Sequence, residues 1–324
     1  MENTTALLWR QEDTLADRKI FVVEADDPSL ANLPKQALFL HSDLATLSAD
    51  QYGPWPQVPS AADLIVVILP KSRERLDLIL TALSHSISEA IELWLVGPSK
   101  GGIKGALKQL KPFAQAGVVD VVDTARHCRL YTSMLVPQQG KTLDDFAQQW
   151  QYEGSTYISY PGVFSHGRLD EGTALLLAQL PTRFDGKKAL DIGCGAGVIA
   201  LELAQRGASV VASDVSATAV AATQATLLAN GQKGEVQVAD LYGELEGQFD
   251  YIVTNPPFHE GIARTTAVTE ALIQNAPNYL KTGGELWLVA NHGLPYEPIL
   301  RQQFNQVDVV VTNNRFVVWR ARKA

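Results

Sequence analysis

The chain has 324 residues, of which 46% are hydrophobic and 19% are charged. This length is too great for one ordinary domain and suits two, and the hydrophobic content excludes a disordered chain. The 27 basic and 35 acidic residues give a net charge of −8, which argues against a protein that coats nucleic acid with its whole surface.

Cysteine usage and the N-terminal sequence bear on the compartment. The two cysteines, Cys128 and Cys194, lie far apart, which excludes a disulfide scaffold and a four-cysteine zinc site. Residues 1–5 show no basic segment leading into an apolar one, and the densest apolar runs, such as residues 64–69, have the length of a strand and not of a membrane span. We therefore expect a soluble, cytoplasmic protein without a membrane partner.

Along the chain, short apolar runs alternate with longer stretches of helical periodicity. In the first half we expect strands at residues 20–23, 37–40, 64–69, 92–96, 118–122 and 130–135, and helices at 72–84 and 103–110. In the second half we expect strands at 188–192, 208–213, 236–239, 251–254, 285–290, 307–312 and 315–321, and helices at 198–206, 217–228, 263–280 and 296–304. The third of these helices is expected to stop at the pair Gly283-Gly284. This alternation is typical of a parallel α/β sheet covered on both faces.

Three short matches between the halves point to an internal duplication. The sequence ELWLV at residues 92–96 recurs at 285–289, and VDVV at 119–122 recurs at 307–310. Asp63, seven residues before a proline, matches Asp250, seven before another. The three matches occur in one order at nearly constant offset, so we predict two copies of one Rossmann-like α/β domain. The expected boundaries are 1–136 for the first domain, 137–165 for a linker that packs on the second domain through its aromatic residues, and 166–324 for the second domain.

The strongest motif is DIGCGAG at residues 191–197, at a predicted strand-to-helix turn. Its glycines permit a tight turn and let a ligand approach the backbone, and the following helix offers unpaired N–H groups. Asp191 would repel a pyrophosphate but suits a cationic amino-acid ligand. Asp214 ends the next strand at the spacing of an acid that binds ribose hydroxyls, and Asp240 ends the third strand, where it could accept from an adenine amino group. Any one of these elements can be a simple turn; three in register favour a ligand site.

A second motif, Asn255-Pro256-Pro257-Phe258, follows the expected strand at 251–254. Two prolines stop the strand and stiffen the loop. The Asn255 side chain and the Pro256 carbonyl would then present acceptors to the two protons of a planar amino group, and Phe258 would stack on its ring. Without the glycine motif upstream, an ordinary strand terminator with a buried phenylalanine would be the better interpretation.

Together these motifs resemble the signature of class I S-adenosylmethionine-dependent methyltransferases, in the branch whose Asn-Pro-Pro-Phe/Tyr loop acts on planar amino groups. A narrower resemblance covers nearly the whole chain and adds YPGVFS at 160–165, LDEGT at 169–173 and NHGLPY at 291–296. With the degenerate first domain, these stretches are similar to the bacterial small-subunit ribosomal RNA methyltransferase C family; the large-subunit methyltransferase G family shares the architecture. The implied fold is α/β, with two tandem class I methyltransferase-type domains, each a mostly parallel sheet with an antiparallel C-terminal strand.

The resemblance also implies roles for individual residues. Asn255, Pro256, Pro257 and Phe258 would form the catalytic loop that holds a flipped guanine. The cofactor, S-adenosylmethionine, would be bound by residues of the glycine turn, of the strand ends and of the segment before them: Asp191, Gly193, Cys194, Gly195, Gly197, Asp214, Asp240, Phe164 and Asp170.

The implied reaction is methyl transfer to the exocyclic N2 of a guanine in 16S ribosomal RNA, with S-adenosylhomocysteine as the product and no metal. The family's target is guanine 1207, and the implied partner is ribosomal RNA within the 30S subunit, bound by a monomer. The alternatives are the same chemistry on 23S ribosomal RNA, methylation of a protein glutamine or an adenine, and a non-enzymatic assembly factor of the small subunit.

The first domain departs from the signature and carries basic residues. Residues 24–28 have no glycine where the glycine turn would be, and residues 68–71 lack the Asn-Pro-Pro pattern, so we expect this copy to bind no cofactor and to serve in substrate docking or folding support. Four lysines at helical spacing, Lys100, Lys104, Lys108 and Lys111, would form one basic stripe. The stripe is interpreted either as an RNA contact or as an ordinary solvated helix face.

Overall fold

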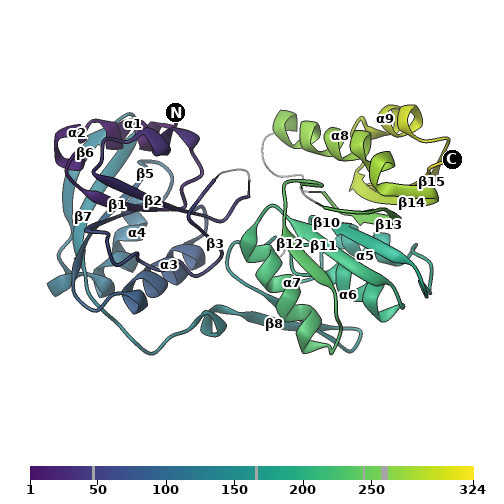
Figure 1. Cartoon of the computed structure of the whole chain (residues 1–324), viewed down its shortest axis with the longest axis horizontal. Coiled ribbons are helices and arrows are strands. Elements are labelled where there is room, and N and C mark those ends of the chain that lie inside the picture. Colours follow the sequence, from purple (N-terminus) through teal and green to yellow (C-terminus); the bar gives the residue numbers. More distant parts are fainter. Residues whose placement is uncertain (46–47, 165–166, 244, 257–261) are drawn as a thin grey trace. The chain divides into compact units, whose positions relative to one another are not determined.

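The computed structural model describes residues 1–45, 48–164, 167–243, 245–256 and 262–324, with backbone alone at 262–265. The chain divides into two compact units, Met1–Ala147 and Gln148–Ala324 (Figure 1). This division falls inside the segment 137–165 that the sequence marks as a linker.

The first unit is built on a seven-stranded sheet of order β3-β2-β1-β4-β5-β7-β6. The continuous apolar runs of the sequence form its buried central strands, and only β7 runs antiparallel to its neighbours β5 and β6. The strands are β1 (Lys19–Val23), β2 (Ala37–Ser42), β3 (Gln51–Tyr52), β4 (Leu64–Ile68), β5 (Ile91–Pro98), β6 (Asp120–Ala125) and β7 (Cys128–Leu135).

Both faces of this sheet are covered. Alternate strand residues face opposite sides, so Phe21 and Ile65 pack with the helices α3 and α4, whereas Ile20 and Leu64 pack with α1 and α2. The helical segments are α1 (Asn3–Trp9), α2 (Glu12–Leu15), α3 (Arg73–Ser86) and α4 (Ile103–Leu110), with 3-10 turns η1 (Pro28–Asn32), η2 (Lys111–Phe113), η3 (Gln115–Gly117) and η4 (Leu143–Phe146).

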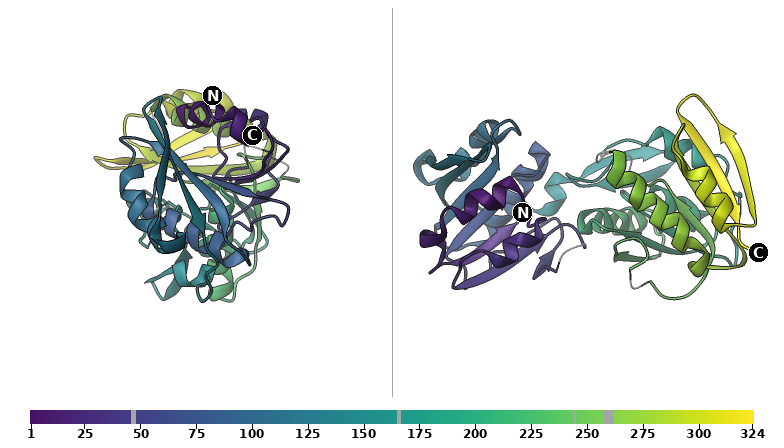
Figure 2. Two further views of the ribbon diagram at one scale, coloured as in Figure 1. Left: turned by 90° about the vertical axis from the view of Figure 1, so that its left-hand side faces the viewer. Right: turned by 90° about the horizontal axis from the view of Figure 1, so that it is seen from above.

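The second unit repeats this plan with a sheet of order β12-β11-β10-β13-β14-β16-β15, in which β16 alone is antiparallel to its neighbours. Figure 2 shows the C-terminal hairpin β15–β16, in yellow, at one edge of this sheet. The strands are β10 (Lys188–Ile192), β11 (Ser209–Asp214), β12 (Glu235–Val238), β13 (Phe249–Thr254), β14 (Leu280–Asn291), β15 (Gln306–Thr312) and β16 (Phe316–Arg322).

Helices again cover both faces. Leu190 and Ile252 pack with α8 and α9, whereas Ala189 and Val253 pack with α5 and α6. The helices are α5 (Glu171–Leu177), α6 (Val198–Gln205), α7 (Ala217–Ala229), α8 (Ile262–Tyr279) and α9 (Tyr296–Gln303). The described helices include none that is long and apolar enough to cross a membrane.

The two sheets have the same strand order, which confirms the predicted duplication. Equivalent side chains also make equivalent bonds: the indole of Trp94 donates to Glu92 at 2.8 Å, and that of Trp287 donates to Glu285 at 2.9 Å. The copies differ after their first strands. In the second unit, α6 follows β10 and α7 follows β11. Among the described residues of the first unit, the segment after β1 holds the 3-10 turn η1 in place of a helix, and the segment after β2 leads without a helix to the short strand β3.

The structure differs from the expected elements at several places. The helix predicted for 263–280 does not run to the glycine pair: α8 ends at Tyr279, two residues after Pro277, and Gly283 and Gly284 lie within β14. A β-bulge in the pairing of β13 with β14 accommodates them. The sequence analysis also did not predict α1, α2, β3, α5 or the hairpin of β8 (Gln148–Tyr152) and β9 (Ser155–Ser159).

The β8–β9 hairpin packs against α7 of the second unit. The side chain of Asn230 accepts from the Thr156 amide at 2.9 Å, and the Thr226 hydroxyl accepts from the Ile158 amide, also at 2.9 Å. Trp150 and Tyr157 stack with their ring centroids 4.4 Å apart. The two aromatic rings also belong to one apolar cluster with Leu227 of α7 and Leu201 of α6.

Candidate active site

The glycine turn lies between β10 and α6, at the carboxyl end of the central strands. Gly193, Gly195 and Gly197 all have positive φ, at 75°, 55° and 78°, a region that other residues rarely adopt. A Cβ atom on Gly193 or Gly195 would meet nothing within 4 Å, so the turn borders open space. A Cβ atom on Gly197 would lie 3.0 Å from Thr223 Cα, so this glycine permits the close packing of α6 on α7.

Asp191, at the end of β10, is completely buried beneath the turn. Its Oδ2 accepts a hydrogen bond from the Ala200 amide at 2.9 Å and so caps the first turn of α6, whose N-cap residue, Gly197, has no side chain to do so. Burial raises the pKa of Asp191 to about 8. Its Oδ1 is buried without a hydrogen-bond partner among the described residues, which makes this oxygen a candidate acceptor for a cationic ligand group.

Asp214, at the end of β11, is tied to the glycine turn. Its Oδ2 accepts from the Gly195 amide at 3.0 Å, and its Oδ1 accepts from the Ser216 amide at 2.9 Å. Asp240 lies beyond the end of β12 and is exposed. Asp214 is therefore the last residue of its strand, as the sequence predicts, whereas Asp240 follows β12 by two residues; of the two acids, Asp214 is the one bonded to the described part of the turn.

Asn255 follows β13 and is held by the segment before α5. Its side-chain amide donates to Asp170 Oδ2 at 2.9 Å and to the Thr173 hydroxyl at 2.8 Å. Its Oδ1 is buried and has no hydrogen-bond partner in the described part of the chain. Pro256 is buried next to it, whereas Pro257 and Phe258 lie outside the described residues.

One pocket joins the glycine turn to Asn255. Of the residues that the sequence marks for the site, it brings together Phe164, Asp170, Gly193, Cys194, Gly195 and Asn255. Its other lining residues are Arg168, Thr173, Ala196, Val198 and Ile199. Asp191, Gly197, Asp214 and Asp240 are not among the lining residues, although Asp214 is bonded to one of them, Gly195.

The sequence analysis gave no role to Arg168 or Thr173. A sequence signal for Thr173 exists, because Asp170, three residues earlier, is a typical N-cap residue before an apolar run. In the structure, Oδ2 of Asp170 accepts a hydrogen bond from the Thr173 amide at 2.9 Å. Arg168 has no such signal, because an isolated exposed arginine near a loop is common. It is the cationic member of the pocket lining.

Cys194 is a buried free cysteine of the glycine turn. Burial raises the pKa of the Cys194 thiol well above its usual value, so this residue is a filler of the turn and not a thiolate nucleophile. Within the described ranges, no group of three or more His, Cys, Asp and Glu side chains is arranged to hold a metal ion.

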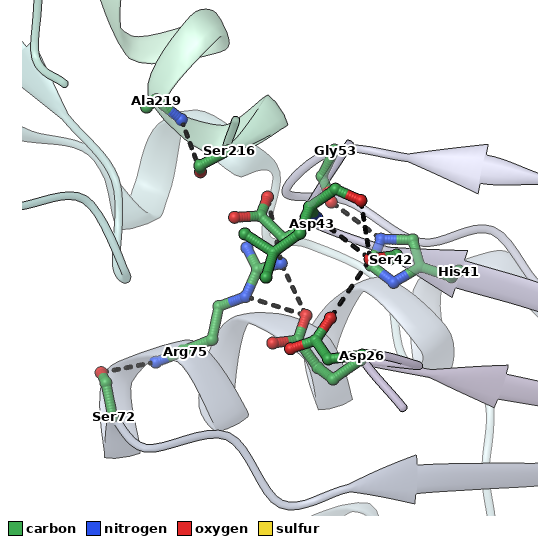
Figure 3. A network of polar contacts seen from close by, with 11 residues as sticks. Asp26, His41, Ser42, Asp43, Gly53, Ser72, Arg75, Ser216 and Ala219 are labelled. Atoms are coloured by element: carbon green, nitrogen blue, oxygen red, sulfur yellow. Dashed lines mark hydrogen bonds and ion pairs between the residues drawn. The ribbon is translucent and has the colours of Figure 1, made fainter. Parts of the chain in front are cut away.

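In the first unit, an ionic network occupies the carboxyl end of the equivalent strands (Figure 3). The guanidinium of Arg75, from α3, is 4% exposed and lies 2.8 Å from Glu24 Oε1 and 3.7 Å from Asp43 Oδ1. His41 Nε2 lies 2.8 Å from the Gly53 carbonyl oxygen, and the Ser42 hydroxyl donates to the carboxylate of Asp26. Charged side chains of the protein itself thus stand where the second unit has its glycine turn and pocket.

The four lysines of the predicted stripe are all exposed, but they do not all belong to one helix. Helix α4 begins at Ile103, after Gly102 with φ of 93°, so Lys100 precedes it; Lys104 and Lys108 lie on α4 and Lys111 follows directly. None of the four forms an ion pair with a described residue, whereas Arg315 and Arg320, near the C-terminus, pair with Glu171 and Asp308.

Two family models together match most of the chain. The Methyltransferase small domain family model matches residues 154–320, and the Methyltransferase small domain N-terminal model matches residues 5–150. A protein of Alcanivorax borkumensis named Ribosomal RNA small subunit methyltransferase C is 47% identical over 99% of both chains. A protein of the same name from Sodalis glossinidius is 34% identical over 97% of this chain and 93% of its own.

A solved structure is similar over the whole chain. It is the T. thermophilus 16S rRNA N2 G1207 methyltransferase in complex with AdoMet and guanosine, which matches with a TM-score of 0.83 and 26% identity over 100% of this chain and 92% of its own. The extent of these matches, the duplicated sheet and the glycine turn beside Asn255 lead to one conclusion. The chain belongs to the ribosomal RNA small subunit methyltransferase C family, and its second unit is a methyltransferase small domain.

Proposed function

We propose that this chain transfers a methyl group from S-adenosylmethionine to the exocyclic N2 of guanine 1207 in 16S ribosomal RNA. The family supports the reaction class, and the related T. thermophilus enzyme acts at this guanine and binds both AdoMet and guanosine. The observation that carries the proposal is the buried Oδ1 of Asn255, which has no hydrogen-bond partner among the described residues and belongs to the pocket that also contains the glycine turn.

The residues of the pocket fit S-adenosylmethionine. The turn leaves open space at Gly193 and Gly195, so a ligand can lie directly on the backbone. The buried Oδ1 of Asp191 suits the ammonium group of the amino-acid moiety, and Arg168 is placed among the lining residues to attract its carboxylate. Asp214 would bind the ribose and Asp240 the adenine. When bound, the cofactor supplies an electrophilic sulfonium methyl group and leaves as S-adenosylhomocysteine.

The catalytic loop acts on the amino group of the guanine. The lone pair of a guanine N2 is delocalised into the ring and must be freed before it can attack. An acceptor at Asn255 Oδ1, with a second at the Pro256 carbonyl, holds the two N–H groups and favours a nitrogen that rehybridises toward the methyl group. After transfer the methylated nitrogen is cationic and releases one of its protons to water. Pro257 would stiffen the loop and Phe258 would stack on the flipped base, which offsets part of the stacking lost on extrusion from the RNA helix.

The first unit is proposed to support this reaction without binding cofactor itself. The Arg75 network stands at the equivalent strand ends, and residues 1–136 would serve as a docking or folding module joined through 137–165 to the catalytic part at 166–324. The exposed Lys100, Lys104, Lys108 and Lys111 would then contact ribosomal RNA in the 30S subunit. The enzyme is proposed to act as a monomer in the cytoplasm.

Methyl transfer from labelled S-adenosylmethionine to purified 30S subunits, 50S subunits and free ribosomal RNA tests the proposal. Incorporation into 16S RNA of the 30S sample is expected. Incorporation into 23S RNA would instead assign the large-subunit activity, and incorporation into protein or adenine would assign a different amino substrate. Cofactor binding without incorporation into any of them would leave a non-enzymatic assembly factor.

A further inference from the structure

The side chain of Asn255 is fixed by two residues from a distant part of the sequence. Asp170, the N-cap of α5, and Thr173, in its first turn, both accept from the Asn255 amide nitrogen, at 2.9 and 2.8 Å. Asp170 lies 85 residues before Asn255 and Thr173 lies 82 residues before it. The end of β13 is thereby joined to the start of a helix that precedes β10.

The chemistry of these partners determines which way the amide of Asn255 points. An ionised carboxylate can only accept hydrogen bonds, so the NH2 group of Asn255, and not its oxygen, must face Asp170. The Thr173 hydroxyl lies 3.4 Å from Asp170 Oδ2, to which it donates, and it accepts from Asn255 with a lone pair. A rotated amide would place Oδ1 against the carboxylate of Asp170 and would lose that bond, and Thr173 could donate to Oδ1 only by giving up its own bond to Asp170.

The amide oxygen is consequently directed away from this pair. It is buried and has no hydrogen-bond partner among the described residues, although buried acceptors are normally satisfied. We propose that Asp170 and Thr173 are positioning residues that hold Asn255 with Oδ1 toward the amino group that accepts the methyl. This inference rests on the proposed function, and it assigns to Asp170 an action through Asn255 in place of a direct contact with the cofactor.

A purely structural role for Asp170 accounts for only part of its contacts. As an N-cap it needs to accept only from the Thr173 amide, which serine or asparagine does equally well. The contact with Asn255 adds nothing to the cap. Substitutions at position 170 can therefore keep the cap while keeping or removing the contact.

Three variants separate the two roles. In Asp170→Ser the short hydroxyl can cap α5 but does not extend to Asn255. In Asp170→Asn a side-chain carbonyl remains at the same reach, so both the cap and the acceptor are kept. In Thr173→Val the second acceptor is removed at almost constant shape. As a matched control, Ser72→Ala removes the N-cap of α3 in the first unit, where Ser72 accepts from the Arg75 amide at 3.2 Å.

Turnover on 30S subunits, the KM for 30S subunits, the cofactor Kd and the melting temperature are measured for each variant. Asp170→Ser and Thr173→Val are expected to lower kcat by about tenfold, somewhat less than deletion of an oriented polar group in a transition-state site. Their KM and cofactor Kd should stay within about twofold of the wild type, a difference close to the error of such measurements. Asp170→Asn should restore most of the turnover, and Ser72→Ala should lower the melting temperature without changing kcat.

A double-mutant cycle with Asn255→Ala makes the test independent of folding effects. If Asp170 acts through Asn255, Asp170→Ser should change kcat much less in the Asn255→Ala background than in the wild type. Equal effects in both backgrounds, or a cofactor Kd weakened as much as kcat, would overturn the inference. An inactive wild type would instead refute the proposed function, and an active wild type with an unaffected Asp170→Ser variant would refute only the positioning role.

Discussion

The backbone amide of Gly195 donates a hydrogen bond to Oδ2 of Asp214 at 3.0 Å, joining the glycine turn to the end of the neighbouring strand. The same carboxylate accepts from the Ser216 amide at the start of α7 through its other oxygen. Gly195 and Asp214, 19 residues apart in the sequence, thus hold the turn and the end of β11 together through the protein's own groups. Such preorganisation lowers the entropy cost of binding.

Gly195→Val should abolish detectable cofactor binding while the fold is retained. The residue has φ of 55°, which a branched side chain tolerates poorly, and its Cβ would enter the open space bordering the pocket. Calorimetric titration with S-adenosylmethionine, with circular dichroism as a check on folding, measures both effects. An unchanged affinity would show that this turn does not bind the cofactor.

Gly197→Ala is the matched control for that substitution. A methyl group here would lie 3.0 Å from the Thr223 backbone and not in open space, again at positive φ. We therefore expect this variant to lower the melting temperature, by an amount equivalent to about 1–3 kcal/mol.

The buried carboxyl of Asp191 should make the stability of the second unit depend on pH. Burial raises its pKa from the ordinary 3.8 to about 8, so its ionisation costs more in the folded than in the unfolded state. The contribution of Asp191 to stability should be fully present below about pH 4 and should be lost as the pH rises from about 4 to 8. Bound S-adenosylmethionine should reduce this slope, because its ammonium group would pair with the ionised carboxylate.

Melting temperatures measured across this pH range, with and without S-adenosylmethionine, test the prediction. The control is Asp191→Asn, which retains an acceptor for the Ala200 amide but cannot ionise. Between pH 4 and 8 the melting temperature of this variant should fall less steeply with pH than that of the wild type, because the contribution of Asp191 is removed. An identical slope in both proteins would show that Asp191 does not titrate there.

Asn255→Ala should lower turnover by about 10²-fold or more, by comparison with the loss of one oriented polar group in other active sites. The cofactor Kd should stay near normal because the glycine turn and Asp214 are untouched. Steady-state kinetics on 30S subunits and calorimetry measure the two quantities. A turnover within a factor of about two, equivalent to ~0.4 kcal/mol, would exclude Asn255 as the group that holds the amine.

Reversal of Lys100, Lys104, Lys108 and Lys111 to glutamate should weaken binding to 30S subunits. Each phosphate contact releases counterions, so the slope of log affinity against log salt should flatten by roughly 2–4. Cofactor affinity and melting temperature should change little, since the lysines are exposed and form no ion pair with a described residue.

Filter binding at several salt concentrations provides the measurement. Lys233→Glu, an exposed residue of the second unit, is the control for a charge change outside the stripe. If the four-lysine variant kept the wild-type slope, the stripe would be an ordinary solvated helix face.

Most of the sheet strands could be predicted from the sequence because they are short apolar runs, whereas the two-residue strand β3 has no such pattern. Residues 188–192 form β10 with the bounds expected, and the repeat of ELWLV places equivalent strands in both units. The β8–β9 hairpin could not be predicted in this way. Its strand β8, Gln148–Tyr152, is polar and mostly exposed, and the hairpin is held by tertiary contacts of β9 with Asn230 and Thr226 of α7.

The parts of the site that could be predicted are those in which a short sequence motif is typical of a single kind of binding or catalytic group. The glycine turn and Asn255 are of this kind, and the structure brings them to one pocket. The role of Asp191 as a buried cap of α6 was not predictable, because it depends on the path of the chain nine residues later. The bond from Asn255 to Asp170 likewise depends on how α5 packs on the sheet, which no local pattern specifies.

Mapping of the methylated nucleoside tests the central claim most directly. Unmethylated 30S subunits are incubated with the wild-type protein and S-adenosylmethionine, and the 16S RNA is then digested for nucleoside mass spectrometry and mapped by fragment analysis. The account predicts N2-methylguanosine at position 1207, with none formed by Asn255→Ala above about one hundredth of the wild-type rate. A methyl group on any other base or atom, or only in 23S RNA, would contradict it.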